Sequence, residues 1–238
     1  MIALLAAVVL AQSAPTAARG PRTGGDLYAT HCISCHGAHL EGTVDAPTLR
    51  GVGAAAVDWA LRTGEMPLEV PGTEPLPGAP AFSPPQIDAL ISYIVTHGGA
   101  GGPPIPQVSR SADVMRGRVV FEQNCQACHG ATAAGAIAGF GWLAPPLRDV
   151  PATQVAEAVR IGPGMMPRFD AHAIPPRDLD ALVTYVGALR HPDDRGGYPM
   201  ANIGPVAEGL VGWVVGLGTT IVLMLAVGET TKRSKRDA

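Results

Sequence analysis

The amino-acid sequence predicts a mainly α-helical protein made of two small tandem domains followed by one C-terminal transmembrane helix. Three observations support this prediction. An internal repeat with a period of roughly 93 to 100 residues covers most of the chain, apolar residues recur at helical spacing near the end of each copy, and one long uncharged run lies near the C-terminus. A length of 238 residues also suits two small domains better than one large core.

Composition narrows the classes of function. The formal net charge is -3, with 17 basic and 20 acidic residues, so no basic surface indicates a nucleic acid partner. Glycine (30) and proline (23) are abundant, which predicts many loops. Such a loop-rich chain needs something besides its own side chains to build its cores around.

The two copies carry the same landmarks in the same order. CISCHG in the first copy matches CQACHG in the second. The other matched positions are Gly24 and Gly117, Tyr28 and Phe121, Pro47 and Pro145, Leu49-Arg50 and Leu147-Arg148, and Met66-Pro67 and Met166-Pro167. We therefore expect one domain over residues 21–98, a Gly/Pro linker over 99–111, and a second domain over 112–191.

A helix is predicted at the end of each copy. The apolar residues follow i, i+3, i+4, i+7 spacing, which places them on one helix face. They are Ile87, Leu90, Ile91 and Ile94 in the first copy, and Leu179, Leu182, Val183 and Val186 in the second. Pro84-Pro85 and Pro175-Pro176 lie just upstream, where a fixed φ favours a helix start.

The N-terminal residues 1–20 are interpreted as a signal peptide or an N-terminal apolar segment. The apolar run 2–11 has signal-peptide length and is too short to span a membrane, although no basic residue precedes it. An ordinary core helix is the alternative. We expect the chain to be exported.

Near the other end, residues 209–227 contain no charge over 19 positions, about the length of a membrane span. We predict a loop over 192–204, a transmembrane helix over 205–228 and a basic cytoplasmic tail over 229–238, with a buried core helix as the alternative. The tail carries Lys232, Arg233, Lys235 and Arg236. The positive-inside rule then places the tandem domains on the outer (periplasmic or extracellular) side of the cell membrane.

The chain contains two Cys-X-X-Cys-His motifs, the attachment signature of c-type haem. Their residues are Cys32, Cys35 and His36, and Cys125, Cys128 and His129. Two thiols one helical turn apart can form thioethers with both vinyl groups of a porphyrin, and the adjacent imidazole can ligate the iron. A zinc ribbon needs its pairs 15 to 20 residues apart, whereas 89 residues separate these pairs. A redox dithiol needs only one pair and no histidine. We expect two covalently bound haem c groups.

The second axial ligand is predicted to be Met66 in the first copy and Met166 in the second, because both precede a proline at matching positions. Met165 is an alternative, since two extra residues lie between Gly162 and the Met-Pro dipeptide. The remaining candidate ligands are His39, His97, His172 and His191, none of which recurs at an equivalent position. His/Met ligation raises a haem's reduction potential.

Two further pairs of residues have expected roles around the haem. Pro47 and Pro145 are candidates to present a backbone carbonyl to the proximal imidazole, with plain loop prolines as the alternative. Arg50 and Arg148 are candidates to pair with haem propionates, or else are solvated surface residues.

Each copy resembles a class I cytochrome c domain, with an aromatic helix, Cys-X-X-Cys-His, a Pro-X-Leu loop, a Met ligand and a closing helix. Over residues 24–228 the chain resembles the dihaem cytochrome c subunit of the actinobacterial cytochrome bcc complex. The motifs that carry this resemblance are LYATHCISCHG, RIGPGMMPRFD and GGYPMANIGPVAEGLVGWVVG.

This resemblance implies an electron-transfer subunit of a proton-translocating quinol:cytochrome c reductase. A Rieske iron-sulfur subunit would reduce the first haem, and the second would pass electrons to the copper-centre subunit of a haem-copper oxidase, with a cytochrome b subunit and membrane lipid as further partners. The alternatives are a stand-alone membrane-anchored dihaem carrier and a dihaem peroxidase-like enzyme. Matched Met-Pro dipeptides argue against the open iron position that a peroxidase needs.

Overall fold

The computed structural model describes residues 23–73, 75–138, 141–190 and 205–234. The predicted N-terminal segment, the loop 192–204 and the end of the basic tail lie outside the described residues. By their contacts, the described residues form two compact units, 23–52 with 60–101, and 53–59 with those from 102 onward.

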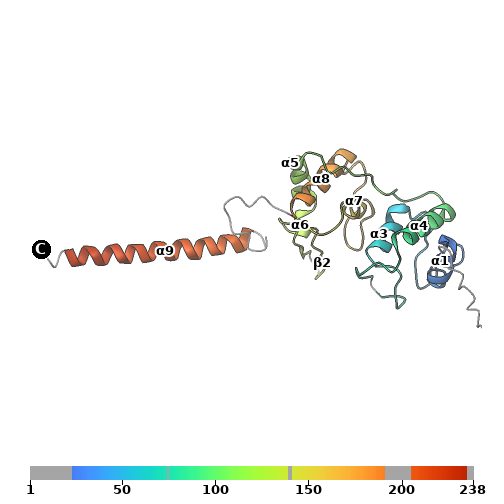
Figure 1. The fold of residues 1–238 in the computed structure, drawn as a ribbon, viewed down its shortest axis with the longest axis horizontal. Helices are drawn as coiled ribbons and strands as arrows, with labels where there is room; N and C mark the ends of the chain where they lie inside the picture. Colours follow the sequence, from blue (N-terminus) through green and yellow to red (C-terminus); the bar gives the residue numbers. More distant parts are fainter. Residues whose placement is uncertain (1–22, 74, 139–140, 191–204, 235–238) are drawn as a thin grey trace, which may run out of the picture. The chain divides into compact units, whose positions relative to one another are not determined.

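The first repeat folds into helices. They are α1 (Gly24–His31), α2 (Ile33–His36), α3 (Ala54–Arg62) and α4 (Pro84–Gly98), as Figure 1 shows. Capping boxes fix two helix starts, with Thr23 and Asp26 exchanging hydrogen bonds at α1, and Ser83 and Gln86 at α4. Helix α4 begins at Pro84 as predicted, and all four residues of its predicted apolar stripe are buried.

The second repeat has the same helix order with one addition. Its elements are α5 (Val114–Asn124), α6 (Gln126–His129), β1 (Ala136–Ile137), β2 (Leu143–Ala144), α7 (Ala152–Ile161) and α8 (Pro176–Ala188). Asp113 caps α5, α8 begins at the predicted Pro176, and the predicted apolar stripe of α8 is buried. The antiparallel β1–β2 hairpin was not predicted, because two-residue strands are too short to show an alternating pattern.

The first and last helices of each repeat pack together, α1 against α4 and α5 against α8. At each packing contact the backbones approach so closely that only glycine fits. A Cβ built at Gly24 would lie 2.1 Å from the Ala89 carbonyl oxygen, and one built at Gly117 would lie 1.9 Å from that of Ala181. The matched glycines in the sequence therefore mark the two helix contacts.

An aromatic pair extends each helix contact into the core. The ring centroids of Tyr28 and Tyr93 are 5.4 Å apart in the first repeat, and those of Phe121 and Tyr185 are 5.5 Å apart in the second. Tyr28 and Phe121 are almost fully buried. Pairs at this separation add to the stability that their burial provides.

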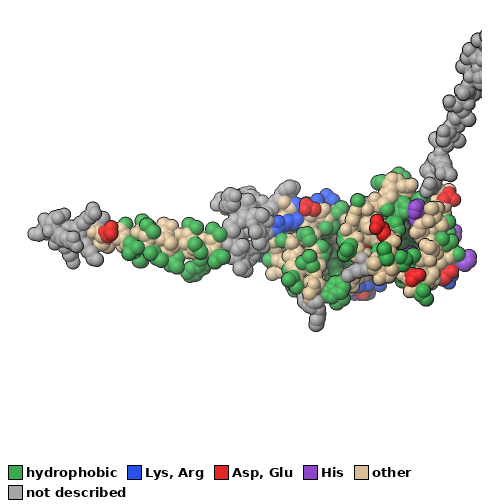
Figure 2. Space-filling model, turned by 90° about the horizontal axis from the view of Figure 1, so that it is seen from below, with side chains coloured by type: hydrophobic (Ala, Val, Ile, Leu, Met, Phe, Trp, Pro, Cys, Tyr) green, Lys and Arg blue, Asp and Glu red, His purple; other side chains and the backbone are tan. Residues whose placement is uncertain are grey.

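The C-terminal helix α9 spans Pro205–Ser234, and within it Gly209–Glu229 is long and apolar enough to cross a membrane. Figure 2 shows hydrophobic side chains along this helix, and none of the span is buried. A helix that is apolar on every side is typical of a membrane span. Helix α9 therefore lies where the transmembrane helix was predicted, and its length and composition are sufficient to span a membrane.

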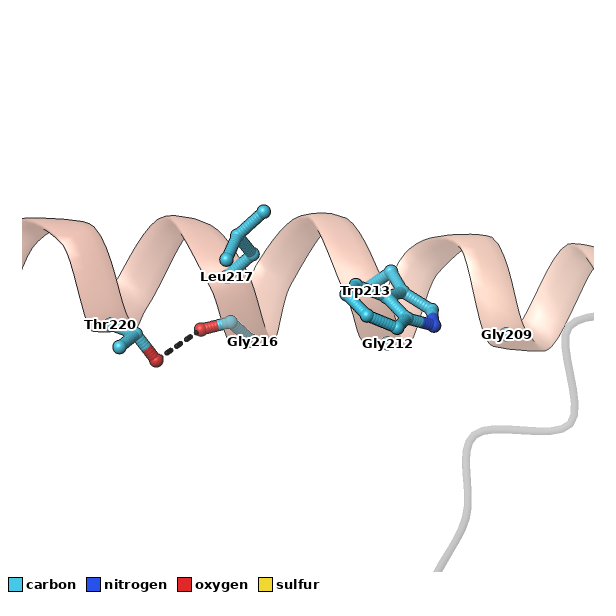
Figure 3. A pocket seen from close by; sticks show the side chains of 6 residues that line it. All are labelled: Gly209, Gly212, Trp213, Gly216, Leu217 and Thr220. Atoms are coloured by element: carbon cyan, nitrogen blue, oxygen red, sulfur yellow. Dashed lines mark hydrogen bonds between the residues drawn. The ribbon is translucent and has the colours of Figure 1, made fainter.

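One face of α9 is made of small residues. Figure 3 shows Gly209, Gly212 and Gly216 along the helix, together with Thr220, whose hydroxyl donates a 2.8 Å hydrogen bond to the Gly216 carbonyl. This bond satisfies the polar group of Thr220 within the helix itself, which suits an apolar environment.

Candidate haem sites

Each Cys-X-X-Cys-His motif lies at a sharp junction between two helices. In the first repeat α1 ends at His31, and the one-turn helix α2 then carries Cys35 and His36. Their amides donate to the Cys32 carbonyl at 3.2 and 2.9 Å, and the equivalent bonds of the second repeat measure 3.1 and 2.9 Å. Gly37, with φ at +79°, ends this turn. Both repeats thus place two thiols and an imidazole on one helical turn.

The proximal imidazoles are oriented by the predicted proline carbonyls. The Nδ1 atom of His36 lies 2.9 Å from the Pro47 carbonyl oxygen, and that of His129 lies 3.0 Å from the Pro145 oxygen. Because a carbonyl only accepts, Nδ1 carries the proton and Nε2 keeps the lone pair that an iron needs. Both histidines are buried. The prediction for Pro47 and Pro145 is confirmed.

The first cysteine of each pair is held as a neutral thiol before haem attachment. Burial raises the pKa of Cys32 to about 11, and the neighbouring Cys35 adds to the shift. Burial and Cys128 likewise raise the pKa of Cys125 to about 11. Dithiol redox catalysts instead work through a cysteine of lowered pKa, so these pairs lack the electrostatics of a thioredoxin-like site.

The candidate distal methionines are half-buried. Met166 packs against the hydrophobic core of the second repeat, whereas the side chain of Met165 is 62% exposed. Met66 is half-buried as well. The alternative ligands His39, His97 and His172 are exposed, and His191 lies outside the described residues.

The two Met-bearing loops are held in different ways. The Met66 amide donates directly to the Ala60 carbonyl in α3 at 2.9 Å. The Met166 amide instead donates to the nearby Pro163 carbonyl at 3.0 Å. Its loop is joined to α7 further along the chain, where the Phe169 amide donates to the Val159 carbonyl at 2.8 Å. Arg160 adds two side-chain bonds there, because its Nη1 donates to the carbonyls of Phe169 and Asp170 at 3.0 and 2.9 Å. The internal repeat did not reveal this role of Arg160. At the matching position of the first repeat, Arg62 forms an ion pair with Asp88 on α4.

Arg50 is exposed and Arg148 is half-buried, and both side chains make a contact that was not predicted. Their pairing with haem propionates stays a prediction. Arg50 Nε donates to the His39 carbonyl at 2.9 Å, and Arg148 Nε donates to the Thr132 carbonyl at 3.0 Å. Both guanidinium groups therefore bind the backbone segment that follows the proximal histidine. The only indication of this shared role in the sequence is that both arginines directly follow Pro-X-Leu.

Another contact, which the sequence comparison did not predict, exists in the first repeat alone. The Tyr28 hydroxyl donates a 2.7 Å hydrogen bond to the Gly37 carbonyl, directly after His36. Phe121 occupies the matching position and has no hydroxyl.

The donor set of each repeat fits a covalently bound haem. Two thiols separated by one helical turn can form two thioethers, and the adjacent imidazole already has its Nδ1 proton engaged by a carbonyl. A ligating histidine typically has this second hydrogen bond, which fixes the ring and raises its basicity. The half-buried methionine further along each repeat is the candidate for the second, soft ligand.

Comparison with known families assigns both repeats. Residues 22–98 match the family described as cytochrome c, and residues 112–186 match the family described as cytochrome C oxidase, cbb3-type, subunit III. Each repeat is therefore a cytochrome c domain, and the chain carries covalently bound haem c.

Relatives cover most of the chain. The cytochrome bc1 complex cytochrome c subunit of Mycobacterium leprae is 36% identical over 217 residues, covering 87% of this chain and 74% of that protein. The subunit of the same name from Corynebacterium diphtheriae is 30% identical, covering 87% and 79%. The cbb3-type cytochrome c oxidase subunit CcoP of Rhodobacter capsulatus is 28% identical, covering 71% and 60%. The chain belongs to the family of cytochrome c subunits of the cytochrome bc1 complex, and it is a dihaem electron carrier of a respiratory complex.

Proposed function

We propose that this chain relays electrons from a Rieske iron-sulfur protein, through the first haem and then the second, to the copper centre of a haem-copper oxidase during quinol oxidation. It acts as the electron-transfer subunit of a proton-translocating quinol:cytochrome c reductase, and the chain alone is an electron carrier. Its partners are a cytochrome b subunit, the Rieske subunit and the oxidase copper-centre subunit. The family assignment and the two haem domains support this proposal.

Each haem is held by two cysteines, one histidine and one methionine. The first set is Cys32, Cys35, His36 and Met66, and the second is Cys125, Cys128, His129 and Met166. When bound, each haem supplies one-electron chemistry at its iron, and His/Met ligation raises its potential toward that of an oxidising partner. The protein residues orient and bury the imidazole and present the half-buried thioether.

One observation carries this proposal. Both repeats combine an oriented, buried imidazole with a half-buried methionine at the matching position. Two axial ligands per iron leave no coordination position for a substrate, which favours an electron carrier over a peroxidase-like enzyme.

The haem domains lie on the outer side of the cell membrane, anchored by α9. The basic tail supports this orientation, because Lys and Arg next to a span favour the cytoplasmic side. Protease added to intact spheroplasts is expected to remove residues 21–191 and to leave the tail protected. Loss of the tail with retention of the haem domains would reverse the topology.

Purification in mild detergent through a tag on this chain tests the assignment of partners. We expect cytochrome b and Rieske subunits to be recovered with it. Recovery of the dihaem chain without them would establish a stand-alone carrier. Binding of carbon monoxide to the native reduced protein would establish an open iron position and favour a peroxidase-like enzyme.

A further inference from the structure

Each proximal histidine is followed by a loop that is hydrogen-bonded to the segment bearing its proline acceptor. We name the loop, residues 37–42 or 130–135, the proximal loop, and we name the segment, residues 47–50 or 145–148, the acceptor segment. The Leu49 amide donates to the Leu40 carbonyl at 2.9 Å, and the Leu147 amide donates to the Ala133 carbonyl at 2.9 Å. Leu40 and Ala133 have φ of +64° and +53°, a backbone conformation that side chains seldom adopt. The same strained reversal is therefore built into both repeats.

An arginine forms the second tie between these segments. It lies three positions after the proline in the acceptor segment. Its side chain reaches the third residue after the histidine, in the proximal loop. Arg50 does so with one bond from Nε to the His39 carbonyl. Arg148 makes two bonds to Thr132, because its Nε donates to the Thr132 carbonyl and its Nη2 donates to the Thr132 hydroxyl, both at 3.0 Å.

We propose that Arg148, and to a smaller extent Arg50, is a positioning residue that holds the proline carbonyl against Nδ1 of the proximal histidine and thereby sets the potential of its haem. This inference rests on the proposed ligation of iron by His36 and His129. A firm Nδ1–H···O bond makes the imidazole a more basic ligand, which stabilises ferric iron. If the arginine is lost, the acceptor segment can move and the bond between the proline carbonyl and Nδ1 weakens. The haem then becomes easier to reduce.

The two repeats differ in how much they depend on the arginine. In the first repeat the Thr48 hydroxyl donates to the Leu40 carbonyl at 2.8 Å and accepts from the Arg50 amide at 3.1 Å. Pro146 occupies the position of Thr48 in the second repeat and has neither a hydroxyl nor an amide proton. Thr48 thus provides a second tie that Pro146 cannot make, so we expect the second repeat to depend more on Arg148.

The test is a redox titration of the full-length haem-loaded chain carrying Arg148→Lys. Lysine keeps the positive charge but lacks the planar fork that makes both bonds to Thr132. We expect the reduced-to-oxidised ratio of the second haem at a fixed potential to rise about tenfold, which corresponds to about 59 mV for a one-electron couple. The first haem is expected to keep its potential.

The direction of the shift separates positioning from a charge effect. Removing a positive charge near a haem, or the partner of a propionate, makes the haem harder to reduce. A lowered potential in Arg148→Ala with no change in Arg148→Lys would therefore overturn the proposal and establish a propionate or field role. A raised potential in Arg148→Lys supports it.

Hydrogen–deuterium exchange provides a readout that does not use the iron. Exchange at the Leu147 amide is expected to accelerate in Arg148→Lys, because the acceptor segment is released from the proximal loop. Should Arg148→Lys fail to retain haem, Arg50→Lys combined with Thr48→Val removes both side-chain ties of the first repeat. That double variant should raise the first potential, whereas Arg50→Lys alone should leave it nearly unchanged.

Failure of this inference can be told apart from failure of the proposed ligation. If the unsubstituted second haem lacks a histidine ligand by spectroscopy, the ligation itself is wrong. If histidine ligation is intact and Arg148→Lys changes neither the potential nor the exchange, the positioning role is wrong.

Discussion

The two repeats agree on the proximal side of the haem site and differ on the methionine side. On the proximal side, the imidazole Nδ1 atoms lie 2.9 and 3.0 Å from their proline carbonyl oxygens. A Cβ built at the glycine of each helix contact would lie 2.1 and 1.9 Å from the facing carbonyl oxygen. In contrast, the Met66 amide itself bonds to α3, whereas the Met166 loop is joined to α7 at Phe169, through its amide and through the side chain of Arg160. The shared features are therefore the orientation of the imidazole and the close helix contact, and the methionine loop is attached at a different position in each repeat.

The largest expected effect is at a shared feature. Gly117→Ala places a Cβ against the Ala181 carbonyl oxygen of α8, and backbone cannot yield as a flexible side chain can. We expect a loss of about 4 kcal/mol or more in the free energy of unfolding of the second domain, measured by thermal or denaturant unfolding. Gly24→Ala should affect the first domain equally.

Gly187→Ala is the matched control for this substitution. Gly187 also lies in α8, but a Cβ there would meet no atom within 4 Å. The alanine should leave stability unchanged or raise it by up to about 1 kcal/mol. If Gly117→Ala behaved like this control, the close helix contact would not be essential.

The next effect separates the two adjacent methionines of the second repeat. Iron-thioether ligation gives a weak near-infrared charge-transfer band, and Met166→Ala should abolish the contribution of the second haem to it. The reduction potential of the second haem should also fall, because a soft ligand to ferrous iron is lost. Met165→Ala should leave the band intact, since that side chain is 62% exposed. If the outcomes were exchanged, Met165 would be the ligand, and if neither changed the band, a histidine would be.

A smaller effect is expected at the difference between the methionine loops. Arg160→Ala removes the two bonds to the Phe169 and Asp170 carbonyls, at a cost of about 1.5 to 3 kcal/mol. The near-infrared band of the second haem should then disappear at a lower temperature. Arg118→Ala is the control in the same repeat, because its exposed bridge to Glu122 contributes about 1 kcal/mol or less. If both changes lowered this temperature equally, Arg160 would have no specific role in holding the methionine loop.

The smallest effect concerns the Tyr28 hydroxyl. Burial raises the pKa of Tyr28 to about 12 from its ordinary value near 10. Because the folded state holds this proton more tightly, the stabilisation is complete below pH 10 and is lost as the pH rises toward 12. Tyr28→Phe should cost about 1 kcal/mol at neutral pH through loss of the bond to Gly37, and should reduce the decline in stability above pH 10. An unchanged alkaline unfolding profile would assign that decline to other groups.

Much of the fold could be predicted because it depends on periodicity and repetition. The stripes of α4 and α8, their proline starts and the spacing of both Cys-X-X-Cys-His motifs are local patterns, and the structure confirms these helices. The proline carbonyls could be predicted because a histidine that ligates a metal needs a second hydrogen bond.

Other features depend on contacts that no local pattern encodes. The roles of Arg50, Arg148 and Arg160 arise from loops that meet only in the folded chain. The two-residue strands of the hairpin are also too short for an alternating pattern to reveal.

The central claim is that each repeat holds one covalent haem with histidine and methionine as axial ligands. Near-infrared magnetic circular dichroism of the oxidised full-length chain, normalised to covalent haem per polypeptide by mass, tests it most directly. We predict two haems per chain, each contributing an iron-thioether charge-transfer band. A mass of bare polypeptide, a single haem, or a band whose intensity accounts for only one of two haems would contradict the account.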